Sequence, residues 1–375
     1  MSTDVRKVAA VVVTYNRLEK LKKVLASLES QTRLPQMLVI VNNAATDGTA
    51  EYLQEYAQRF ALSDSIQLDI VTLEKNEGGA GGFSAGMRRS YELGADYAWI
   101  FDDDGYPEPD ALDKLVLGYD NAVAELGPDV PFACSMVKYI DGTISEMNNP
   151  IPTWDWGRLK AKGLDIVMVS RCSFVSVLIP RWVMEAFGLP YKEYFIWFDD
   201  AEYTLRITKS CPGVQVLDSV VLHDMGVNRG VNFSMIDEKN AWKFSYGVRN
   251  EASYHLHHEG FYQYLRFCVL VWNGMRHGNV AKPLRKKMYK KIQRLEDAAI
   301  KTSKNLVLNE KKAYKDESDE KQAYSSYVYS LLSSKKILLS SSIDTTDKTY
   351  QRWKDEKISL SEFLRYAVNK EWVDI

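Results

Sequence analysis

The chain has 375 residues, 46% of them hydrophobic and 26% charged, which is enough for one large globular domain with an appendage or for two domains. Its formal net charge of −2 argues against a general nucleic-acid-binding protein. The four cysteines form no C-x-x-C pair, the N-terminus shows no signal peptide, and no run of about 18 apolar residues occurs. We expect a cytoplasmic protein without zinc, disulfides or a membrane-spanning helix.

The N-terminal part alternates between short apolar runs and segments with helical spacing. We expect strands over 8–13, 37–41, 67–73 and 98–101, and helices over 18–30, 50–60 and 84–93. Continuous apolar runs are typical of parallel strands that are buried on both faces. The alternation predicts a doubly wound α/β sheet, and the polar loops at the carboxyl ends of its strands are expected to line one crevice.

Later residues follow a different pattern. We expect strands over 132–139, 166–174, 175–179 and 214–222, with a helix that continues to about residue 208. Beyond about Ala241 the strand signals end, and helices are expected to residue 375, with a weakly packed Lys/Glu/Ser-rich stretch at 311–322. We therefore predict an α/β domain over 1–240 and a helical region over 241–375.

An apolar run over 98–101 ends directly in three carboxylates, those of Asp102, Asp103 and Asp104. A buried strand that delivers acids to the ligand-binding edge of a sheet has this pattern. Asp102 and Asp104 can converge on one divalent cation, because such cations prefer carboxylate oxygens. The alternative is a helix start, opened by Pro107, in which one aspartate is the cap. Capping needs one such residue rather than three, so we expect a metal or phosphate site.

Other polar loops follow the first three strands. The glycines of 78–82 are expected either to approach a ligand or to form a tight turn, and their spacing is neither a dinucleotide fingerprint nor a P-loop. Arg17 either pairs with a phosphate or is a solvated charge at a helix start, and Thr14 is a similar case. Asn43 and Asp47 either contact a nucleotide or hydrogen-bond their own turn.

A second acid cluster, formed by Asp199, Asp200 and Glu202, follows the aromatic residues Trp197 and Phe198. Partial desolvation beside aromatic rings raises the proton affinity of a carboxylate, which suits a general base. A helix N-terminus also favours acids through its dipole, and both explanations can hold together. We expect a catalytic acid in this cluster.

His223 ends a predicted strand, as the acid triplet does. A lone histidine is more often a structural residue than a ligand. An acid pair nevertheless needs further ligands to complete the coordination of a cation, and an imidazole can supply one. We expect a metal ligand here, with a structural role as the alternative.

Together these segments resemble the family 2 glycosyltransferases of the GT-A fold, over about residues 7–250. The resemblance rests on an ordered set: 12–17 (VVTYNR), 41–49 (VNNAATDGT), the D-x-D motif at 102–104 and the downstream acid cluster. More narrowly, three segments resemble bacterial galactofuranosyltransferases and related rhamnosyltransferases: 76–83 (NEGGAGGF), 197–203 (WFDDAEY) and 222–224 (LHD). Asn42 departs from the family, which often has Asp at that position.

The resemblance implies a Rossmann-like, doubly wound mixed sheet for the catalytic domain. It also implies that Asp102, Asp104 and His223 hold Mn²⁺ or Mg²⁺ against the diphosphate of a sugar nucleotide, and that Asp200 is the catalytic base. The expected substrate contacts are Thr14, Arg17, Asn43, Asp47, Gly79, Gly81, Gly82, Asp103, Trp197 and Asp199.

The implied reaction is an inverting, metal-dependent transfer of galactofuranose from UDP-galactofuranose to a growing bacterial surface polysaccharide or a lipid-linked glycan. A dTDP-rhamnose-dependent rhamnosyltransferase is the nearest alternative. A nucleotidyltransferase, from a different class, would carry a basic glycine-rich loop after the first strand, which 14–17 lacks. A sugar-nucleotide-binding module without catalysis is disfavoured by the acids at Asp102, Asp104 and Asp200.

The segment 261–275 is apolar and aromatic, and a strongly basic stretch follows over 282–294. This combination suits docking on an anionic membrane surface, such as the inner face of the cell membrane, where lipid-linked acceptors reside. The equal alternative is a helix packed on the catalytic domain with a solvated basic face. A homo-oligomer interface is a further alternative.

Overall fold

A computed structural model describes residues 6–60 and 66–293. These residues divide after Val231 into two compact units, which we describe separately. An α/β unit precedes this point and a helical unit follows it, whereas the sequence predicts a boundary near Asn240. The helices expected over 294–375, including the Lys/Glu/Ser-rich stretch, lie outside the described residues.

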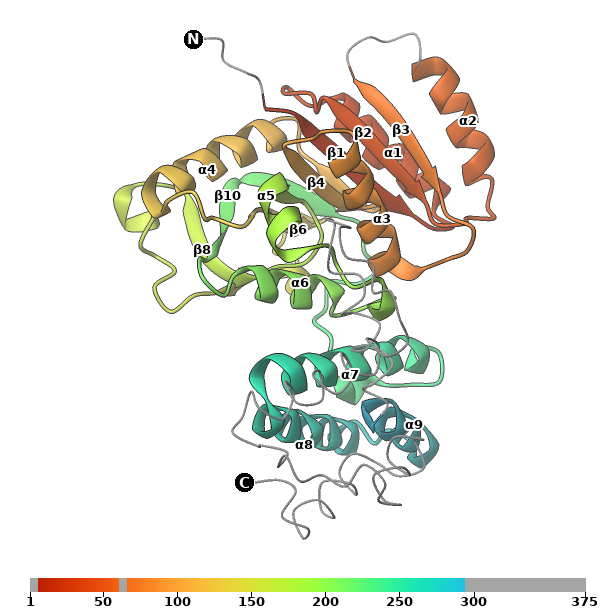
Figure 1. Cartoon of the computed structure of the whole chain (residues 1–375). Coiled ribbons are helices and arrows are strands. Elements are labelled where there is room, and N and C mark those ends of the chain that lie inside the picture. The colour runs from red at the N-terminus through yellow and green to blue at the C-terminus, as the bar shows by residue number, and fades with distance from the viewer. Residues whose placement is uncertain (1–5, 61–65, 294–375) are drawn as a thin grey trace, which may run out of the picture. The chain divides into compact units, whose positions relative to one another are not determined.

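A ten-stranded mixed sheet forms the centre of the α/β unit (Figure 1). The strands follow the order β3-β2-β1-β4-β9-β6-β10-β8-β7, and β5 pairs with β10. The first four in this order are parallel, whereas β9 and β8 run antiparallel to their neighbours. The bounds are β1 Val8–Thr14, β2 Met37–Asn42, β3 Gln67–Thr72, β4 Tyr97–Asp102, β5 Gly105–Pro107, β6 Ala133–Tyr139, β7 Ile151–Pro152, β8 Ile166–Arg171, β9 Val177–Pro180 and β10 Gly213–His223.

Helices cover both faces of this sheet, and each face has its own hydrophobic core. Alternate residues of β1 enter the two cores: Val12 packs among residues of α1, α2 and α4, and Val13 among residues of α3, α5 and α6. This arrangement confirms the doubly wound α/β prediction. The bounds are α1 Leu18–Glu29, α2 Thr49–Phe60, α3 Gly78–Glu92, α4 Ala111–Leu126, α5 Arg181–Phe187 and α6 Asp199–Ile207, with short turns η1 Glu146–Asn148, η2 Lys160–Lys162 and η3 Lys192–Tyr194.

Several boundaries differ from the sequence-based prediction. Pro107 lies in β5 and not in a helix, because β5 pairs antiparallel with the end of β10 before α4 begins at Ala111. The strand expected over 175–179 begins only at Val177, the first residue of β9. Ser176, directly before it, has a positive φ of 62°, which is outside the range of extended strands. Helix α3 begins at Gly78, whereas the sequence predicts a start at Ser84.

The helical unit consists of α7 (Ala241–Tyr254), α8 (Phe261–His277) and α9 (Lys282–Gln293), with the short elements η4 (Phe233–Met235) and η5 (His255–Glu259). Phe267, Val271 and Met275 recur at every fourth position of α8 and are buried. The ring of Phe267 packs against that of Phe233, with centroids 5.6 Å apart. No helix in the described part of the chain is long and apolar enough to cross a membrane.

Candidate active site

Strands from distant parts of the chain end at one edge of the sheet. Thr14, at the end of β1, pairs in register with Asn42, at the end of β2. β4 ends beside β1 with Asp102. The end of β10 reaches the same place through β5, whose Gly105 pairs with His223. The parallel register therefore brings the polar residues after these strands together, as expected for a doubly wound sheet.

Asp103 is buried, and the loop after β1 holds both of its carboxylate oxygens. Oδ2 accepts hydrogen bonds from Thr14 Oγ1 at 2.9 Å and from the Tyr15 N–H at 3.4 Å, and Oδ1 accepts one from Arg17 Nη1 at 3.0 Å. Arg17 also donates to Asp104 Oδ2 at 2.8 Å. Thr14 and Asp103, both predicted substrate contacts, thus have partners within the protein. Arg17 bridges two acids and is not merely a solvated charge.

Asp102, Asp104 and His223 can each direct one ligand atom to a common point. These atoms all lie within 4.8 Å of one another, and His223 Nε2 is 3.2 Å from Asp104 Oδ1. Carboxylate oxygens suit Mg²⁺ and Mn²⁺, and an imidazole nitrogen can complete such a set. None of the three aspartates of the triplet caps α4, which begins at Ala111, so the helix-start alternative is wrong. The three predicted metal ligands are therefore brought together.

The orientation of the His223 ring is set by Asn148, at the end of η1. Asn148 Nδ2 donates to Ser173 Oγ at 2.8 Å, which leaves Asn148 Oδ1 to accept from Ser145 Oγ at 2.6 Å and from His223 Nδ1–H at 2.8 Å. Nε2 then faces Asp104 Oδ1, and either a proton or a metal cation must lie between these two atoms. Where a cation takes the place of the proton, the imidazole nitrogen and the carboxylate oxygen can both bind it, so the residues present fit a bound metal.

The acids at this edge differ in charge state. Burial raises the pKa of Asp102 well above its usual range, and the charges of Asp104 and other acids, including Asp199, raise it further. Burial would also raise the pKa of Asp104, but the hydrogen bond to His223 and the charges of His223 and Arg17 lower it to about 2. A bound cation would favour the ionised form of Asp102.

The backbone before α6 adopts an unusual conformation. Phe195, Trp197 and Phe198 have φ values of 64°, 66° and 69°, a region that residues other than glycine rarely adopt. The start of α3 supports this segment: the Ala80 N–H donates to the Phe195 carbonyl at 3.2 Å. A Cβ on Gly78 would overlap that carbonyl. Strained segments of this kind cluster at functional sites, and this one aims the first residues of α6.

Asp199 and Asp200 open α6, where the helix dipole favours negative charge. Burial raises the pKa of Asp199 to about 8, and the charge of Asp200 contributes to the rise. Burial also raises the pKa of Asp200, but the Ala201 N–H, which donates to Asp200 Oδ1 at 2.7 Å, and the charge of Arg171 oppose it. Of the two carboxyls, Asp199 therefore retains a proton more readily and Asp200 retains a negative charge more readily.

The loop after β2 uses its polar side chains to stabilise the backbone. Asn43 Nδ2 donates to the Gly78 carbonyl at 2.8 Å, and Asn43 Oδ1 accepts from the Glu77 N–H at 2.8 Å. Asp47 Oδ2 accepts from the Leu18 N–H, at the start of α1, at 3.0 Å. Asp47 also accepts from the Thr49 N–H at 3.3 Å, within its own turn, whereas Asn43 bonds the start of α3 and not its own turn. The nucleotide contacts of both residues stay a prediction.

The glycine cluster packs the start of α3 closely, against the sheet at Gly82 and against Glu77 at Gly81, and its contact with a ligand stays a prediction. A Cβ on Gly82 would overlap the side chain of Val13 in β1, and one on Gly81 would overlap Glu77. Gly79 differs, because a Cβ there would make only an ordinary contact with the ring of Phe83, at 3.9 Å. Of the three glycines predicted as substrate contacts, two are buried for packing.

Glu202 is the member of the second acid cluster that the structure assigns to folding. It is fully buried, and its two carboxylate oxygens accept from Arg206 Nε at 2.7 Å and Arg206 Nη2 at 3.1 Å. Arg206 also donates to the Leu189 carbonyl at 3.1 Å. The i, i+4 spacing of this acid and base was a readable signal. No comparable signal points to Asn148, which lies in an irregular segment.

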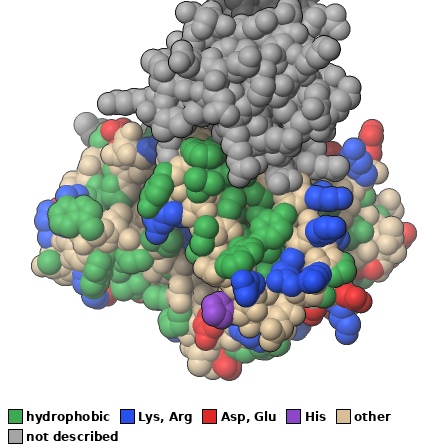
Figure 2. Space-filling view, turned by 90° about the horizontal axis from the view of Figure 1, so that it is seen from below, with side chains coloured by type: hydrophobic (Ala, Val, Ile, Leu, Met, Phe, Trp, Pro, Cys, Tyr) green, Lys and Arg blue, Asp and Glu red, His purple; other side chains and the backbone are tan. Residues whose placement is uncertain are grey.

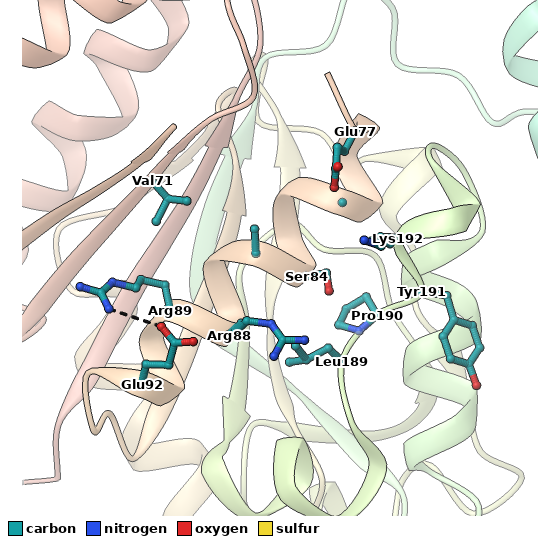
Figure 3. Close-up of a pocket in the computed structure, with 12 residues that line it drawn as sticks. Val71, Glu77, Ser84, Arg88, Arg89, Glu92, Leu189, Pro190, Tyr191 and Lys192 are labelled. Carbon is teal, nitrogen blue, oxygen red and sulfur yellow. Dashed lines mark hydrogen bonds and ion pairs between the residues drawn. The ribbon is translucent and has the colours of Figure 1, made fainter. Parts of the chain in front are cut away.

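A recess of about 270 Å³ lies between α3 and the residues 189–192 (Figure 3). Ser84, Arg88 and Lys192 point into it, whereas Arg89 turns away toward Glu92. Arg89 is also held by Asp69, to which its Nη2 donates at 2.7 Å. None of the residues that line the recess belongs to either acid cluster.

Comparison with known proteins decides the family. Residues 9–147 match the family described as glycosyl transferase family 2. The chain is 31% identical to the galactofuranosyltransferase GlfT1 of Mycobacterium tuberculosis over 229 residues, which are 58% of this chain and 70% of that protein. The chain belongs to glycosyltransferase family 2. This glycosyltransferase is also 27% identical to GlfT1 of Mycolicibacterium smegmatis over 238 residues, 60% of this chain and 74% of that one. The predicted family and enzyme class are confirmed, and the nucleotidyltransferase alternative is wrong.

A solved structure shares the fold of this glycosyltransferase. GalNAc-T7, crystallised with UDP, GalNAc and Mn²⁺, superposes with a TM-score of 0.53 at 12% sequence identity. The match covers 77% of this chain and 55% of GalNAc-T7, just over half of its length. With the mixed sheet described above, this likeness confirms the predicted GT-A fold.

Proposed function

We propose that this glycosyltransferase transfers galactofuranose from UDP-galactofuranose to a hydroxyl group of a glycan or lipid-linked glycan, with inversion at the anomeric carbon. The observation that carries the reaction class is the convergence of ligand atoms from Asp102, Asp104 and His223, which all lie within 4.8 Å of one another. The similarity to GlfT1 supports galactofuranose as the sugar. The UDP bound in GalNAc-T7, which shares the fold, is consistent with a uridine nucleotide.

Asp102, Asp104 and His223 would hold Mn²⁺ or Mg²⁺, and the fold neighbour GalNAc-T7 contains Mn²⁺. A divalent cation at this position supplies Lewis-acid stabilisation of the charge on the departing nucleoside diphosphate. Asp104 also accepts a hydrogen bond from Arg17 Nη1 at 2.8 Å, and this cation favours the ionised form of Asp104. Asn148 keeps the Nε2 atom of His223 directed at the two acids.

Asp200 is the proposed base. The oxygen of the acceptor hydroxyl forms a bond to the anomeric carbon, and the proton of that hydroxyl passes to the Asp200 carboxylate. The bond between the anomeric carbon and the phosphate oxygen breaks, and the nucleoside diphosphate leaves with that electron pair. Attack from the face opposite the leaving group inverts the configuration in one displacement. Asp199, protonated at neutral pH, can donate a hydrogen bond to a sugar hydroxyl, and Trp197 beside it can pack on a sugar face.

Donor identity is tested by calorimetric binding of UDP-galactofuranose, UDP-galactopyranose and dTDP-rhamnose, each with Mn²⁺ and with EDTA. We expect tight binding of the UDP-galactofuranose–Mn²⁺ combination alone. Asp104→Asn should weaken binding in Mn²⁺ but not in EDTA, and Asp110→Asn, on an exposed turn before α4, is the matched control. Preferential binding of dTDP-rhamnose would overturn the donor assignment, and equal binding with and without metal would overturn the metal site.

A further inference from the structure

Helix α8 presents apolar side chains on two opposite faces. The inner face contains the buried residues Phe267, Val271 and Met275. On the outer face Val269 and Leu270 are each 57% exposed, although both are large and apolar. The complete outer stripe consists of Tyr262, Leu265, Val269, Leu270 and Trp272. At about 1.5 Å rise per residue, it runs most of the length of the helix. An exposed apolar stripe of this kind marks an interaction surface.

The segment that contains this stripe is rich in positive charge. From Gly260 to Gln293 the sequence contains no Asp or Glu, although the whole chain has a formal charge of −2. The same segment contains eight cationic side chains: Arg266, Arg276, Lys282, Arg285, Lys286, Lys287, Lys290 and Lys291. Figure 2 shows hydrophobic side chains beside Lys and Arg side chains on one face of the molecule. Positive charge is therefore concentrated in α8 and α9.

The two kinds of side chain are combined in an amphipathic arrangement. The Arg276 guanidinium carbon lies 4.6 Å from the centroid of the Trp272 ring, so a cation rests on the exposed stripe itself. In α9, Lys282, Lys286 and Lys290 recur at every fourth position and are exposed, while Met288 and Ile292 are buried. Aromatic and aliphatic residues next to lysine and arginine are the composition of helices that lie in a membrane interface.

We propose that α8 and α9 form a docking surface for an anionic phospholipid membrane, with the α8 stripe at the level of the acyl boundary and the α9 lysines against lipid phosphates. Charge complementarity selects this occupant. A second copy bound through the same face would bring together two pairs of helices that each carry eight cationic side chains and no Asp or Glu, and these would repel each other. A neutral apolar protein partner would offer no charge that complements these cations. The helices lie on such a membrane rather than cross it.

The test is co-sedimentation of the full chain with vesicles of phosphatidylcholine, with and without phosphatidylglycerol. We expect binding only when phosphatidylglycerol is present, and we expect salt to weaken it. The double substitution Leu265→Glu/Val269→Glu should reduce the partition coefficient by at least about tenfold, as should Lys282→Glu/Lys286→Glu/Lys290→Glu. Leu117→Glu, at an equally exposed leucine of α4, is the matched control and should bind as the unmodified chain does.

Three outcomes would overturn this inference: no binding to vesicles that contain phosphatidylglycerol, equal binding to both vesicle types, or unchanged binding of both multiple variants. Size-exclusion chromatography with light scattering accompanies the assay. Conversion of an oligomer into monomers by Leu265→Glu/Val269→Glu, with vesicle binding retained, assigns the stripe to a protein interface instead. Vesicle binding requires no sugar nucleotide, so it fails or succeeds independently of the proposed transfer reaction.

Discussion

Asn148 and His223 are 75 positions apart in the sequence, yet Asn148 Oδ1 and His223 Nδ1 are joined by a buried hydrogen bond of 2.8 Å. Because Nδ1 is bonded to Asn148, Nε2 is the imidazole nitrogen that faces Asp104. Asn148 follows directly after the segment 9–147 that matches the family, on a short turn held by Ser145 and Ser173. The orientation of the proposed metal ligand His223 thus depends on a residue that is neither an acid nor part of a motif.

Asn148→Ala should weaken metal binding by about 10- to 100-fold, since loss of a hydrogen-bonding partner behind a histidine ligand typically has this effect. The ring would be free to rotate and to offer the wrong nitrogen. Calorimetric titration of Mn²⁺ in the presence of UDP measures the change. Asn149→Ala, at the exposed neighbouring residue, is the matched control. An unchanged Mn²⁺ affinity in Asn148→Ala would show that His223 is not a ligand.

Asp200→Asn should abolish transfer and leave binding of the sugar nucleotide intact, because an amide cannot take the acceptor proton. Asp199→Asn should retain most of the activity near neutral pH, since Asp199 is already uncharged there. Initial rates and donor affinity, measured for both variants, separate the two roles. If Asp199→Asn is inactive and Asp200→Asn is active, the base has been assigned to the wrong carboxyl.

Asp199 should also make stability depend on pH. Its pKa is about 8 in the folded protein and about 4 in the unfolded chain, so between these values the folded state binds more protons. The free energy of unfolding should therefore fall as the pH rises from about 4 to about 8. Asp199→Asn should flatten this slope. Thermal melts across this range test the prediction, and identical slopes for the two proteins would contradict it.

The sequence predicts the scaffold of the site well. Apolar runs that end in polar residues predict β1, β2, β4 and β10, and parallel pairing then requires their carboxyl ends to meet. For this reason the strand pattern predicts that Asp102, Asp104 and His223 lie at one edge of the sheet, and the pairing of β5 with β10 then brings His223 to the acids. A rule about strand ends needs no knowledge of side-chain packing.

Packing decides the parts that sequence reasoning missed. The sequence does not distinguish a glycine in a ligand-binding loop from one in a helix packed against a sheet. At Gly82 the distinction comes from Val13, whose side chain leaves no room for a Cβ. β5 has three residues and no periodicity, so its pairing with β10 is visible only in three dimensions. The burial of Glu202 likewise depends on the position of α6 relative to Leu189.

Gly82→Ala should destabilise the protein by about 1–3 kcal/mol, the usual cost of overpacking, because the new methyl group would meet Val13. Gly79→Ala, three positions earlier in the same helix, has room for a methyl group and should be neutral or stabilising. Urea unfolding measures both. Val13→Ala should partly rescue Gly82→Ala. A loss of donor binding in Gly79→Ala without loss of stability would restore this glycine as a substrate contact.

The buried pair of Glu202 and Arg206 provides a last test, because it joins α6 to the chain at Leu189. Glu202→Gln would leave the buried Arg206 charge without a counter-ion, and removal of one partner from such a pair typically costs about 3–5 kcal/mol. The pair of Glu185 and Arg181 has the same i, i+4 spacing but is partly exposed, with 46% of the Glu185 side chain accessible, so Glu185→Gln should cost less than about 1 kcal/mol.

Urea unfolding of these two variants makes the comparison. Replacement of both Glu202 and Arg206 by leucine should recover part of the stability, because no unpaired charge remains buried. We expect transfer activity to depend on the position of α6 and not on the charges of Glu202 and Arg206. If α6 keeps its position in the double variant, Asp200 keeps its role and transfer activity is retained. Equal destabilisation by Glu202→Gln and Glu185→Gln would mean that burial adds nothing to the pair. A stable but inactive double variant would show that the buried pair also positions Asp200 for transfer.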